Sequence, residues 1–322
     1  MPITLAEGNR NTQTDLDVAV IDEFRKESVV LDTMIFDDVV NPAGGGATMT
    51  YGYRRLKTQP TAAFRELNTE YTPANVETEH HTTGLAVLGG TFQIDRVIAK
   101  LGPAASGGVA LNMRQKTKAT ITKFQDAVIN GDVAAEAHGF DGLDKALTGS
   151  STEMTTTASW QDLDTDPSAP HKALDLFDEF LSLLDGTPTI ILGNTKALAK
   201  VRAIVRRSSM YQREPIEGLV GANGRPITRE SYGGIFFADP GNKAGTNNPI
   251  IPVTAGKTDL YAYRVGLDGF HGISTAGGQL VETWLPDFSN VKAVQEGGVE
   301  LGPVGVALKA TKAAAVLRGI TV

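Results

Sequence analysis

Gly256-Lys257-Thr258 comes closest to a phosphate-binding pattern, because these three residues match the end of a phosphate-binding loop. The earlier glycine of that pattern is replaced by Ile251. A helix should also follow the loop, since the N–H groups of its first turn hold the phosphates. Residues 259–263 instead have the pattern of a strand. The sequence therefore predicts a turn that leads into a strand.

Asp162, Asp164 and Asp166 have the spacing of the first three oxygen ligands of a calcium loop. The sixth position of such a loop needs glycine and the twelfth needs glutamate, but these positions hold Pro167 and Ala173. We therefore expect a solvated acidic linker that caps the following helix.

Two further patterns also fail at required positions. Glycines 218, 221 and 224 are spaced GxxGxxG rather than GxGxxG, and they run into residues 225–227, which cannot open a dinucleotide-binding helix. Ser274 lies in a segment that lacks the last glycine of the nucleophile-elbow pattern. A glycine-rich turn or loop is expected at the first site and no nucleophile at the second.

The five histidines do not form a metal or catalytic set. His80 and His81 are adjacent on a predicted strand, so their side chains point to opposite faces and cannot chelate one ion together. His138, His171 and His271 have no partner at ligand spacing. Together with Ser274 they are predicted to be ordinary surface or loop residues. The sequence thus predicts no enzyme, no metal and no cofactor.

Composition excludes several other classes of protein. The chain has 322 residues and no cysteine, which excludes a disulfide scaffold, a zinc–thiolate site and a thiol nucleophile. The net charge is −7, so a general basic surface does not hold the chain on nucleic acid. Neither an apolar run long enough to span a membrane nor the pattern of a signal peptide is visible. We expect a soluble protein with no membrane partner.

The first segment is polar and acidic. Eight acids and only two bases fall within residues 15–38, and a partial helical stripe predicts a short helix near 16–30. The residues before it show no pattern, so they resemble an arm that becomes ordered on another surface.

Residues 41–95 are predicted to form a long ribbon. Strand patterns occur at 48–53, 76–80 and 85–88, with a polar stretch at 54–75. The ribbon has few bulky apolar side chains, and a two-stranded ribbon is marginal in water unless it lies on a neighbouring surface. That neighbour can be another subunit.

A long helix is predicted from about residue 106 to 130, with a length of roughly 35–40 Å. Its apolar side is marked by Val109, Met113, Ile121, Phe124 and Val128. No acid occurs between residues 100 and 123, so the helix is predicted to carry a basic flank. The flank consists of Arg114, Lys116, Lys118 and Lys123.

An α/β pattern follows a polar boundary at residues 149–170. It comprises a helix at 173–184, a buried strand at 189–192, a helix that buries residues 198–205, short strands through 218–265 and closing strands in the tail. The basic run from Lys196 to Arg213 has two interpretations. It could meet phosphates or the acidic 15–38 segment of a neighbouring chain, or it could be a solvated helix face.

Four segments carry a resemblance to a known family. Residues 22–31 (DEFRKESVVL) look like an arm helix, and 88–97 (LGGTFQIDRV) are similar to a strand between an extended loop and a long helix. Residues 139–143 (GFDGL) resemble a short Gly-Leu motif, and 306–320 look like a closing strand. Their order resembles the major capsid proteins of tailed bacteriophages, whose fold is called the Hong Kong 97-type fold.

The resemblance implies an α+β fold with five parts. These are an N-terminal arm (1–40), an extended β-hairpin loop (41–98), a peripheral domain with a long spine helix (99–149), an axial α/β domain (150–290) and C-terminal return strands of the peripheral domain (291–322). The arm begins at Met1, so any scaffold is expected to be a separate protein. We assign no residues to the Lys–Asn cross-link that some members of the family form.

The function implied by the resemblance is self-assembly. The chain would form pentamers and hexamers that build an icosahedral shell around the double-stranded DNA of a tailed phage, in the virion capsid, after assembly in the host bacterial cytoplasm. Portal, scaffold and cement proteins would be its partners, and the basic flank would lie near packaged DNA. The candidate inter-subunit contacts are Asp22, Glu23, Glu27, Arg54, Arg55, Arg65, Arg202, Arg206 and Arg207.

Two other functions remain open at this point. The first keeps the fold and makes the chain an encapsulin, the shell of a bacterial compartment that packages a cargo enzyme. The second is a two-domain α/β enzyme of unrecognised type that uses residues 170–265.

Overall fold

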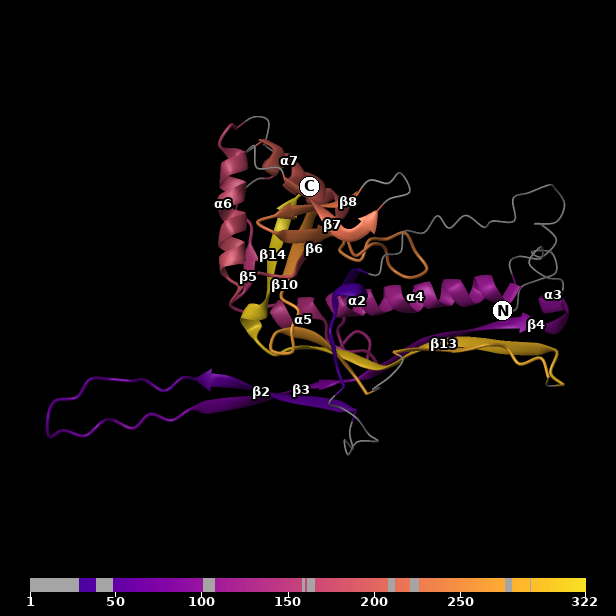
Figure 1. The fold of residues 1–322 in the computed structure, drawn as a ribbon, viewed down its shortest axis with the longest axis horizontal. Coiled ribbons are helices and arrows are strands. Elements are labelled where there is room, and N and C mark those ends of the chain that lie inside the picture. Colours follow the sequence, from indigo (N-terminus) through magenta and orange to yellow (C-terminus); the bar gives the residue numbers. More distant parts are fainter. Residues whose placement is uncertain are drawn as a thin grey trace.

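The computed structural model describes residues 29–38, 49–100, 108–157, 160, 166–207, 212–220, 226–275, 280–289 and 291–322. The molecule is elongated (Figure 1). A two-stranded hairpin projects from one end, a long helix lies along a five-stranded sheet, and a second sheet with two covering helices forms a compact unit beside them. Among the described helices, none combines the length and apolar character needed to cross a membrane.

The projecting hairpin lies within the predicted ribbon of residues 41–95, but the last part of that ribbon, Ala86–Asp95, pairs with a long strand of the five-stranded sheet instead. β2 (Thr50–Thr58) pairs antiparallel with β3 (Glu77–Gly84), with Tyr53 opposite His81. Residues 59–76 form the turn between them. Most residues of both strands are exposed, and no further strand pairs with either of them in the described residues.

The five-stranded sheet is organised around one long strand. That strand is β13 (Val294–Leu308), 15 residues long, and it pairs antiparallel with three others. The other strands are β1 (Phe36–Asp37), β4 (Ala86–Asp95), β11 (Phe270–Ser274) and β12 (Val281–Trp284). The short helices near this sheet are α2 (Val29–Thr33) and α3 (Arg96–Lys100).

The predicted long helix is confirmed as α4 (Gly108–Asn130), which at 23 residues is roughly 35 Å long. Phe124 and Val128 of its predicted apolar side are fully buried. Gln125 is also buried, and its Oε1 accepts a hydrogen bond of 2.9 Å from the N–H of Val30, which fixes α2 to the helix. The predicted apolar residues nearer the start of the helix are only half-buried.

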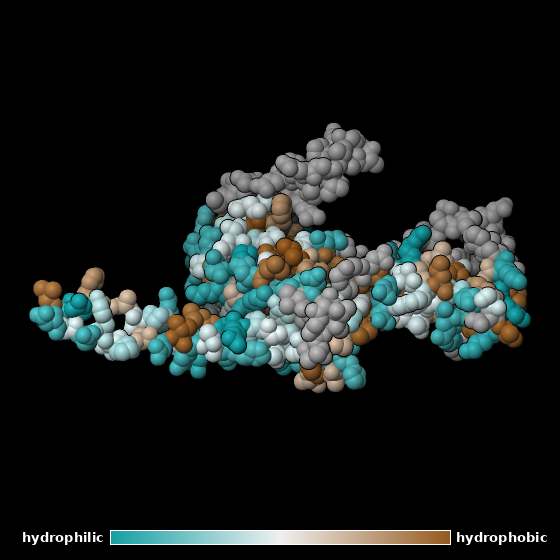
Figure 2. Space-filling model, turned by 60° about the horizontal axis from the view of Figure 1, so that its bottom comes forward, coloured by the Kyte–Doolittle hydropathy of each residue, from teal (hydrophilic) through white to brown (hydrophobic). Residues whose placement is uncertain are grey.

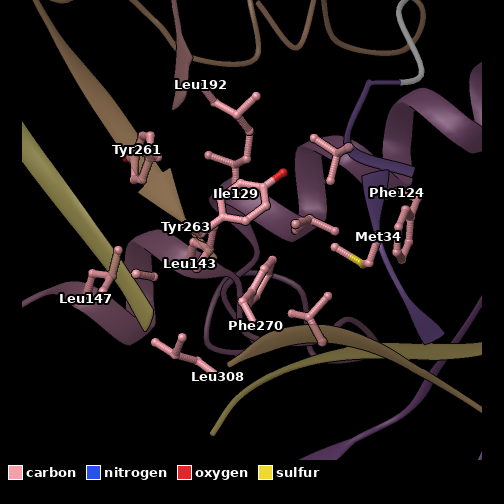
Figure 3. Close-up of a cluster of buried hydrophobic side chains, with 14 of the residues drawn as sticks. Met34, Phe124, Ile129, Leu143, Leu147, Leu192, Tyr261, Tyr263, Phe270 and Leu308 are labelled. Atoms are coloured by element: carbon pink, nitrogen blue, oxygen red, sulfur yellow. The ribbon is translucent and has the colours of Figure 1, made fainter. Parts of the chain in front are cut away.

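The main core joins all these elements. Figure 3 shows side chains from α4, the short helix α5 (Leu143–Leu147) and both sheets meeting in one cluster. Tyr263 and Phe270 pack edge to face there, with ring centroids 5.1 Å apart. Because these two rings come from different sheets, the cluster fixes the two sheets to each other.

The second sheet has seven strands and confirms the predicted α/β pattern. The strand order is β5-β14-β10-β6-β9-β8-β7. The bounds are β5 (Glu153–Thr155), β6 (Ile190–Gly193), β7 (Gln212–Val220), β8 (Pro226–Tyr232), β9 (Ile235–Ala238), β10 (Lys257–Tyr263) and β14 (Ala314–Thr321).

Two amphipathic helices cover this sheet. They are α6 (Ala169–Ser182) and α7 (Thr195–Arg207), and the side chains that they bury form a second core with β6, β10 and β14. Asp166 accepts hydrogen bonds from the N–H and the hydroxyl of Ser168, the N-cap residue of α6, at 2.8 and 2.7 Å. This agrees with an acidic linker at the start of the helix. Asp162 and Asp164 lie outside the described residues.

The course of the last third of the chain differs from the predicted boundaries. Of the predicted peripheral return strands, β13 joins the five-stranded sheet, but β14 lies inside the seven-stranded sheet. Conversely β11 and β12, within the predicted axial domain, pair with β13. The chain thus passes between the two sheets more than once, and strand pairs so distant in sequence leave no local signal.

Candidate inter-subunit surfaces

The root of the hairpin is fixed to the body by tyrosines. The hydroxyl of Tyr51 donates to Oδ2 of Asp37 at 2.9 Å, and the hydroxyl of Tyr53 donates to the carbonyl of Leu308 at 3.1 Å. Burial and the adjacent Asp37 carboxylate raise the pKa of Tyr51, so its phenol stays protonated and remains a donor. The hairpin therefore leaves the body in a defined direction.

Arg55 belongs to the same root. Its Nε donates to the carbonyl of Lys309 at 2.9 Å, its Nη2 donates to the carbonyl of Leu308, and its guanidinium lies over the ring of Tyr53. Arg55, which was predicted to contact another subunit, therefore makes these contacts within its own chain. Arg54, the next residue, is exposed and lies opposite His80. A role between subunits stays a prediction for both arginines.

His271 corrects a prediction made from the sequence. It is fully buried on β11, and within the described residues neither ring nitrogen makes a hydrogen bond of good geometry. Its Nε2 lies 3.9 Å from Oδ2 of Asp37, and its ring packs edge to face on Tyr51. The prediction of a surface or loop position was wrong because β11 is an inner strand between β1 and β13. The same error applies to Ser274, which is also buried on β11.

The chemistry around His271 keeps it neutral. Burial, followed by the charge of Lys309, lowers its pKa. Lys309 Nζ lies 3.9 Å from Oδ2 of Asp37 and over the ring of Tyr51. This root cluster of Asp37, Tyr51, His271 and Lys309 comes from four separate segments. Sequence reasoning missed it for that reason, and the lone histidine in an apolar run was the available signal.

The turn of the hairpin exposes apolar side chains to solvent. We call Phe64, Arg65, Leu67 and Tyr71 the hairpin tip; its three apolar members are strongly exposed. The guanidinium of Arg65 lies 5.4 Å from the ring centroid of Tyr71 and donates to the carbonyls of residues 66 and 69, each at 3.2 Å. Exposed apolar groups on a projecting element are typical of an association surface.

A second exposed apolar group lies at the other end of the molecule. We call it the far-end patch, and it comprises Val97, Trp284, Leu285, Phe288 and Val291. It surrounds the end of β4 and the beginning of β13, opposite the hairpin (Figure 1). Figure 2 shows brown, apolar side chains at both ends of the elongated surface.

The four basic residues of α4 do not share one face. At 100° per residue, Arg114 and Lys118 lie on one side and Lys116 and Lys123 on the other. Lys123 pairs with Glu136 at 2.7 Å. The side chain of Lys116 lies beside Gly90 of β4. The helix therefore presents two basic sites, and proximity to DNA stays a prediction for each.

The basic helix α7 is amphipathic. This form fits both a helix that contacts a partner and a helix with a solvated basic face. Arg202, Arg206 and Arg207 are exposed, while the opposite face buries apolar side chains in the second core. Their predicted acidic partners Asp22, Glu23 and Glu27 lie outside the described residues. Contact between the arm and α7 therefore stays a prediction.

One segment that came close to an enzyme motif has a structural role, whereas Gly221 and Gly224 of the GxxGxxG pattern lie outside the described residues. The predicted strand-entry turn is confirmed, because β10 begins at Lys257 and Gly256 has a φ of +74°, which glycine adopts without strain. Within the described residues, no group of three or more metal-binding side chains could hold an ion. His138 and His171 are exposed, as predicted.

One charged cluster was not predicted. Arg318 pairs with Asp144 at 2.8 Å, with Asp259 at 3.3 Å and with Glu153, and so joins α5, β5, β10 and β14. Burial lowers the pKa of Arg318, but its bonds to the carboxylates raise it by more, so it stays charged. The cluster connects elements of one chain and has no feature of a binding site.

Comparison with known proteins identifies the fold. No protein-family model and no curated protein matches the sequence. The capsid of a native gene transfer agent particle is similar in structure, with a TM-score of 0.64 and 13% identity over 98% of each chain. The capsid of Myoviridae phage XM1 has a TM-score of 0.60 and 10% identity over 99% of each chain.

An encapsulin is similar to the same degree. The SrpI encapsulin from Synechococcus elongatus PCC 7942 has a TM-score of 0.61 and 15% identity, and the alignment covers 100% of this chain and 97% of that chain. Full-length likeness to capsid shells, together with the hairpin, the long helix and the mixed sheets, identifies the fold. The chain has the α+β Hong Kong 97-type fold.

Proposed function

We propose that the chain is a major capsid protein that self-assembles through pentamers and hexamers into the icosahedral shell of a tailed phage. The main support is the hairpin, which projects from the body with apolar side chains at its tip and has no core of its own. Such a ribbon gains stability only on another surface, and a second copy of the chain provides one. The full-length fold likeness to capsid shells supports the same function.

The parts of the fold have distinct roles in this proposal. The hairpin lies across an adjacent subunit, α4 and the five-stranded sheet form the peripheral body, and the seven-stranded sheet with α6 and α7 surrounds the capsomer axes. Exposed bases on α7 meet the acidic arm of a neighbour, which favours correct contacts over wrong ones. The shell encloses double-stranded DNA and works with portal and scaffold proteins. No catalytic step is part of this function.

Expression and electron microscopy test this proposal. The chain is purified alone and with its genomic neighbours, and negative-stain images are recorded. Closed particles, tubes, or free pentamers and hexamers are expected. A compact monomer under every condition contradicts the proposal.

The encapsulin function is the second candidate, favoured by the full-length likeness to SrpI. Most of the similar structures come from phages or gene transfer agent particles, which supports the phage function instead. The contents of purified particles separate the two candidates. Particles that contain a specific protein cargo favour an encapsulin, whereas particles that package DNA with a portal favour the phage capsid.

A further inference from the structure

The root of the hairpin covers one face of the five-stranded sheet, on the side away from α4 (Figure 1). Ile273 of β11 and Ala307 of β13 lie on this face and pack against Tyr51, so the three form a small cluster apart from the two cores. The approach is close, because a Cβ on Gly305 would lie 3.0 Å from the carbonyl oxygen of Gly84. The hairpin itself therefore shields the side chains of this face from solvent.

His271 is the basic side chain on this face. It follows Phe270, whose ring belongs to the main core, so the imidazole points the other way, toward the hairpin root. Its ring packs edge to face on Tyr51, with ring centroids 5.8 Å apart. The imidazole is fully buried, and within the described residues neither of its nitrogens has a hydrogen bond of good geometry. A buried polar group without partners destabilises the arrangement that buries it.

The charges around the ring do not favour its protonation on balance. Oδ2 of Asp37 lies 3.9 Å from Nε2 of His271, but this oxygen already accepts the Tyr51 hydroxyl at 2.9 Å. Lys309 lies 3.9 Å from the same oxygen and adds a positive charge. Burial, followed by the charge of Lys309, outweighs the attraction of Asp37 and lowers the pKa of His271. The closed root therefore holds the imidazole neutral.

Opening of the root removes this constraint. Tyr51 is a hairpin residue that packs on the ring, so lifting β2 from the sheet brings the imidazole of His271 into water. In water the pKa of a histidine is near its ordinary value of 6.5, whereas the closed root holds it lower. Proton uptake is therefore linked to opening. Below this ordinary value, each unit of pH raises the ratio of open to closed root by up to about tenfold, until the closed form also binds the proton.

We infer that His271 makes the hairpin root an acid-released latch, which is closed near neutral pH and opens when a proton binds the imidazole, so that the hairpin can change direction. The device lies within one subunit, so it goes beyond the proposed function and does not depend on a shell. Tyr51, Tyr53 and Arg55 hold the closed form from one strand, β2, and can leave the sheet together. The group that binds the proton and the bonds that it controls thus meet at one small interface.

Two histidines on the hairpin provide an alternative sensor. His81 of β3 stacks on Tyr53, with ring centroids 5.6 Å apart, and its Nε2 lies 3.7 Å from Oε2 of Glu79. His80 beside it is exposed and lies opposite Arg54. The side chain of His81 is partly exposed, so it can bind a proton while the root stays closed. A variant of His81 is therefore the matched control for a variant of His271.

A distance measurement between the hairpin and the body tests the inference. The chain has no cysteine, so Lys57→Cys on β2 and Glu179→Cys on α6, both at exposed positions, introduce one spin label each. Labelled chains are diluted in unlabelled chain, so that double electron–electron resonance records distances within one subunit. A narrow distribution is expected at about pH 7.5. A broad second component should grow about tenfold in its share between about pH 7.5 and pH 5.

The two histidine variants should behave differently. His271→Asn removes the proton site and keeps a polar side chain, so the share of the broad component should be the same at both pH values. His81→Asn should respond to acid as the wild type does. The inference is overturned if the wild type does not respond, if His271→Asn responds as fully as the wild type, or if the response is lost in His81→Asn instead.

A further variant tests the latch if His271→Asn does not fold. Tyr51→Phe keeps the ring over His271 but removes the hydroxyl that donates to Asp37, so the broad component should already be large at about pH 7.5. A distribution as narrow as that of the wild type would show that this bond does not hold the root, and the inference would fail.

Hydrogen exchange separates the latch from acid unfolding of the whole chain. At about pH 5 the protection of amides in β2 and β11 should fall, after correction for the intrinsic exchange rate, while the seven-stranded sheet keeps its protection. Equal loss of protection in both sheets would mean that acid unfolds the chain globally, and would overturn the latch. Assembly into particles is not needed for either measurement, so the latch and the proposed function can fail separately.

Discussion

Single side chains decide the direction in which the hairpin leaves the body. Arg55 donates to the carbonyls of Leu308 and Lys309, while Arg54 beside it makes no contact of this kind. A charged donor on a partly buried carbonyl contributes more than a neutral one. The root of the hairpin is therefore stabilised by one arginine of an adjacent pair.

The first prediction compares these two arginines. Arg55→Ala should destabilise the chain by about 1–2 kcal/mol and increase amide hydrogen exchange in β2 and β3. Arg54→Ala should leave both properties nearly unchanged, because its side chain is exposed. Hydrogen exchange measured by mass spectrometry on the unassembled subunit checks this. Equal exchange in the two variants would show that the Arg55 bonds do not hold the root.

The second prediction concerns pH. Burial holds the pKa of His271 below its ordinary value of 6.5, so the unfolded chain binds this proton more readily than the folded chain. The free energy of unfolding should therefore fall as pH drops through the unfolded value and level off below the folded one. The groups that face the ring are Asp37, Tyr51 and Lys309.

Denaturant unfolding of the subunit at a series of pH values measures this effect. His271→Asn removes the titrating group, so its stability should depend less on pH across the same range. His138→Asn, at an exposed position, is the control and should retain the wild-type slope. If the free energy of unfolding of His271→Asn keeps the wild-type dependence on pH, the buried histidine does not contribute to that dependence.

At the level of elements, the close approach of Gly142 to the end of α4 explains the predicted Gly-Leu motif. A Cβ on Gly142 would lie 2.6 Å from the carbonyl oxygen of Ala127 and 2.8 Å from the backbone nitrogen of Gly131, so only glycine fits between them. Leu143 after it is buried at the start of α5. The motif therefore fixes α5 against the end of α4.

The third prediction follows from this contact. Gly142→Ala should destabilise the chain by about 2 kcal/mol or more, because the backbone that it meets cannot move aside as a flexible side chain does. A Cβ on Gly84, at the end of β3, would meet no atom within 4 Å, so Gly84→Ala is the matched control. Thermal unfolding of both variants tests the difference, and similar losses of stability would contradict the account.

The fourth prediction concerns the elements that Arg318 joins. Arg318→Ala leaves three carboxylates from α5, β5 and β10 without their common cation, and should cost about 2–4 kcal/mol. Lys145→Ala removes one exposed ion pair with Asp132, which solvent screens, so it should cost much less than Arg318→Ala. Chemical denaturation of both variants checks the difference. A small loss in Arg318→Ala would mean that the sheet and α5 hold together without the cluster.

Elements with a strong local pattern could be predicted from the sequence, and those defined by distant pairing could not. The apolar period of α6 and α7 and the apolar stripe of α4 depend on neighbouring residues alone. The predicted bounds of these helices are therefore close to the observed bounds. The placement of β14 between β5 and β10, and the burial of His271, depend on strands far away in sequence. The hairpin strands could be predicted because their pattern is local. The root cluster and the far-end patch could not be predicted, because each brings together residues that are far apart in the sequence.

At the scale of the whole molecule, the two ends of the elongated shape differ in character from the body between them. The hairpin tip and the far-end patch both expose apolar side chains, and the body has two cores of its own. A body with its own cores and with exposed apolar side chains at both ends of the molecule is suited to repeated head-to-tail contact. This arrangement accounts for a projecting ribbon better than any function confined to one subunit.

A single-particle reconstruction of the assembled chain tests this central claim most directly. The account predicts a closed shell in which residues 59–76 of each subunit lie against the next subunit. Particles in which this hairpin folds back on its own chain, or a preparation that contains only compact monomers, would contradict it.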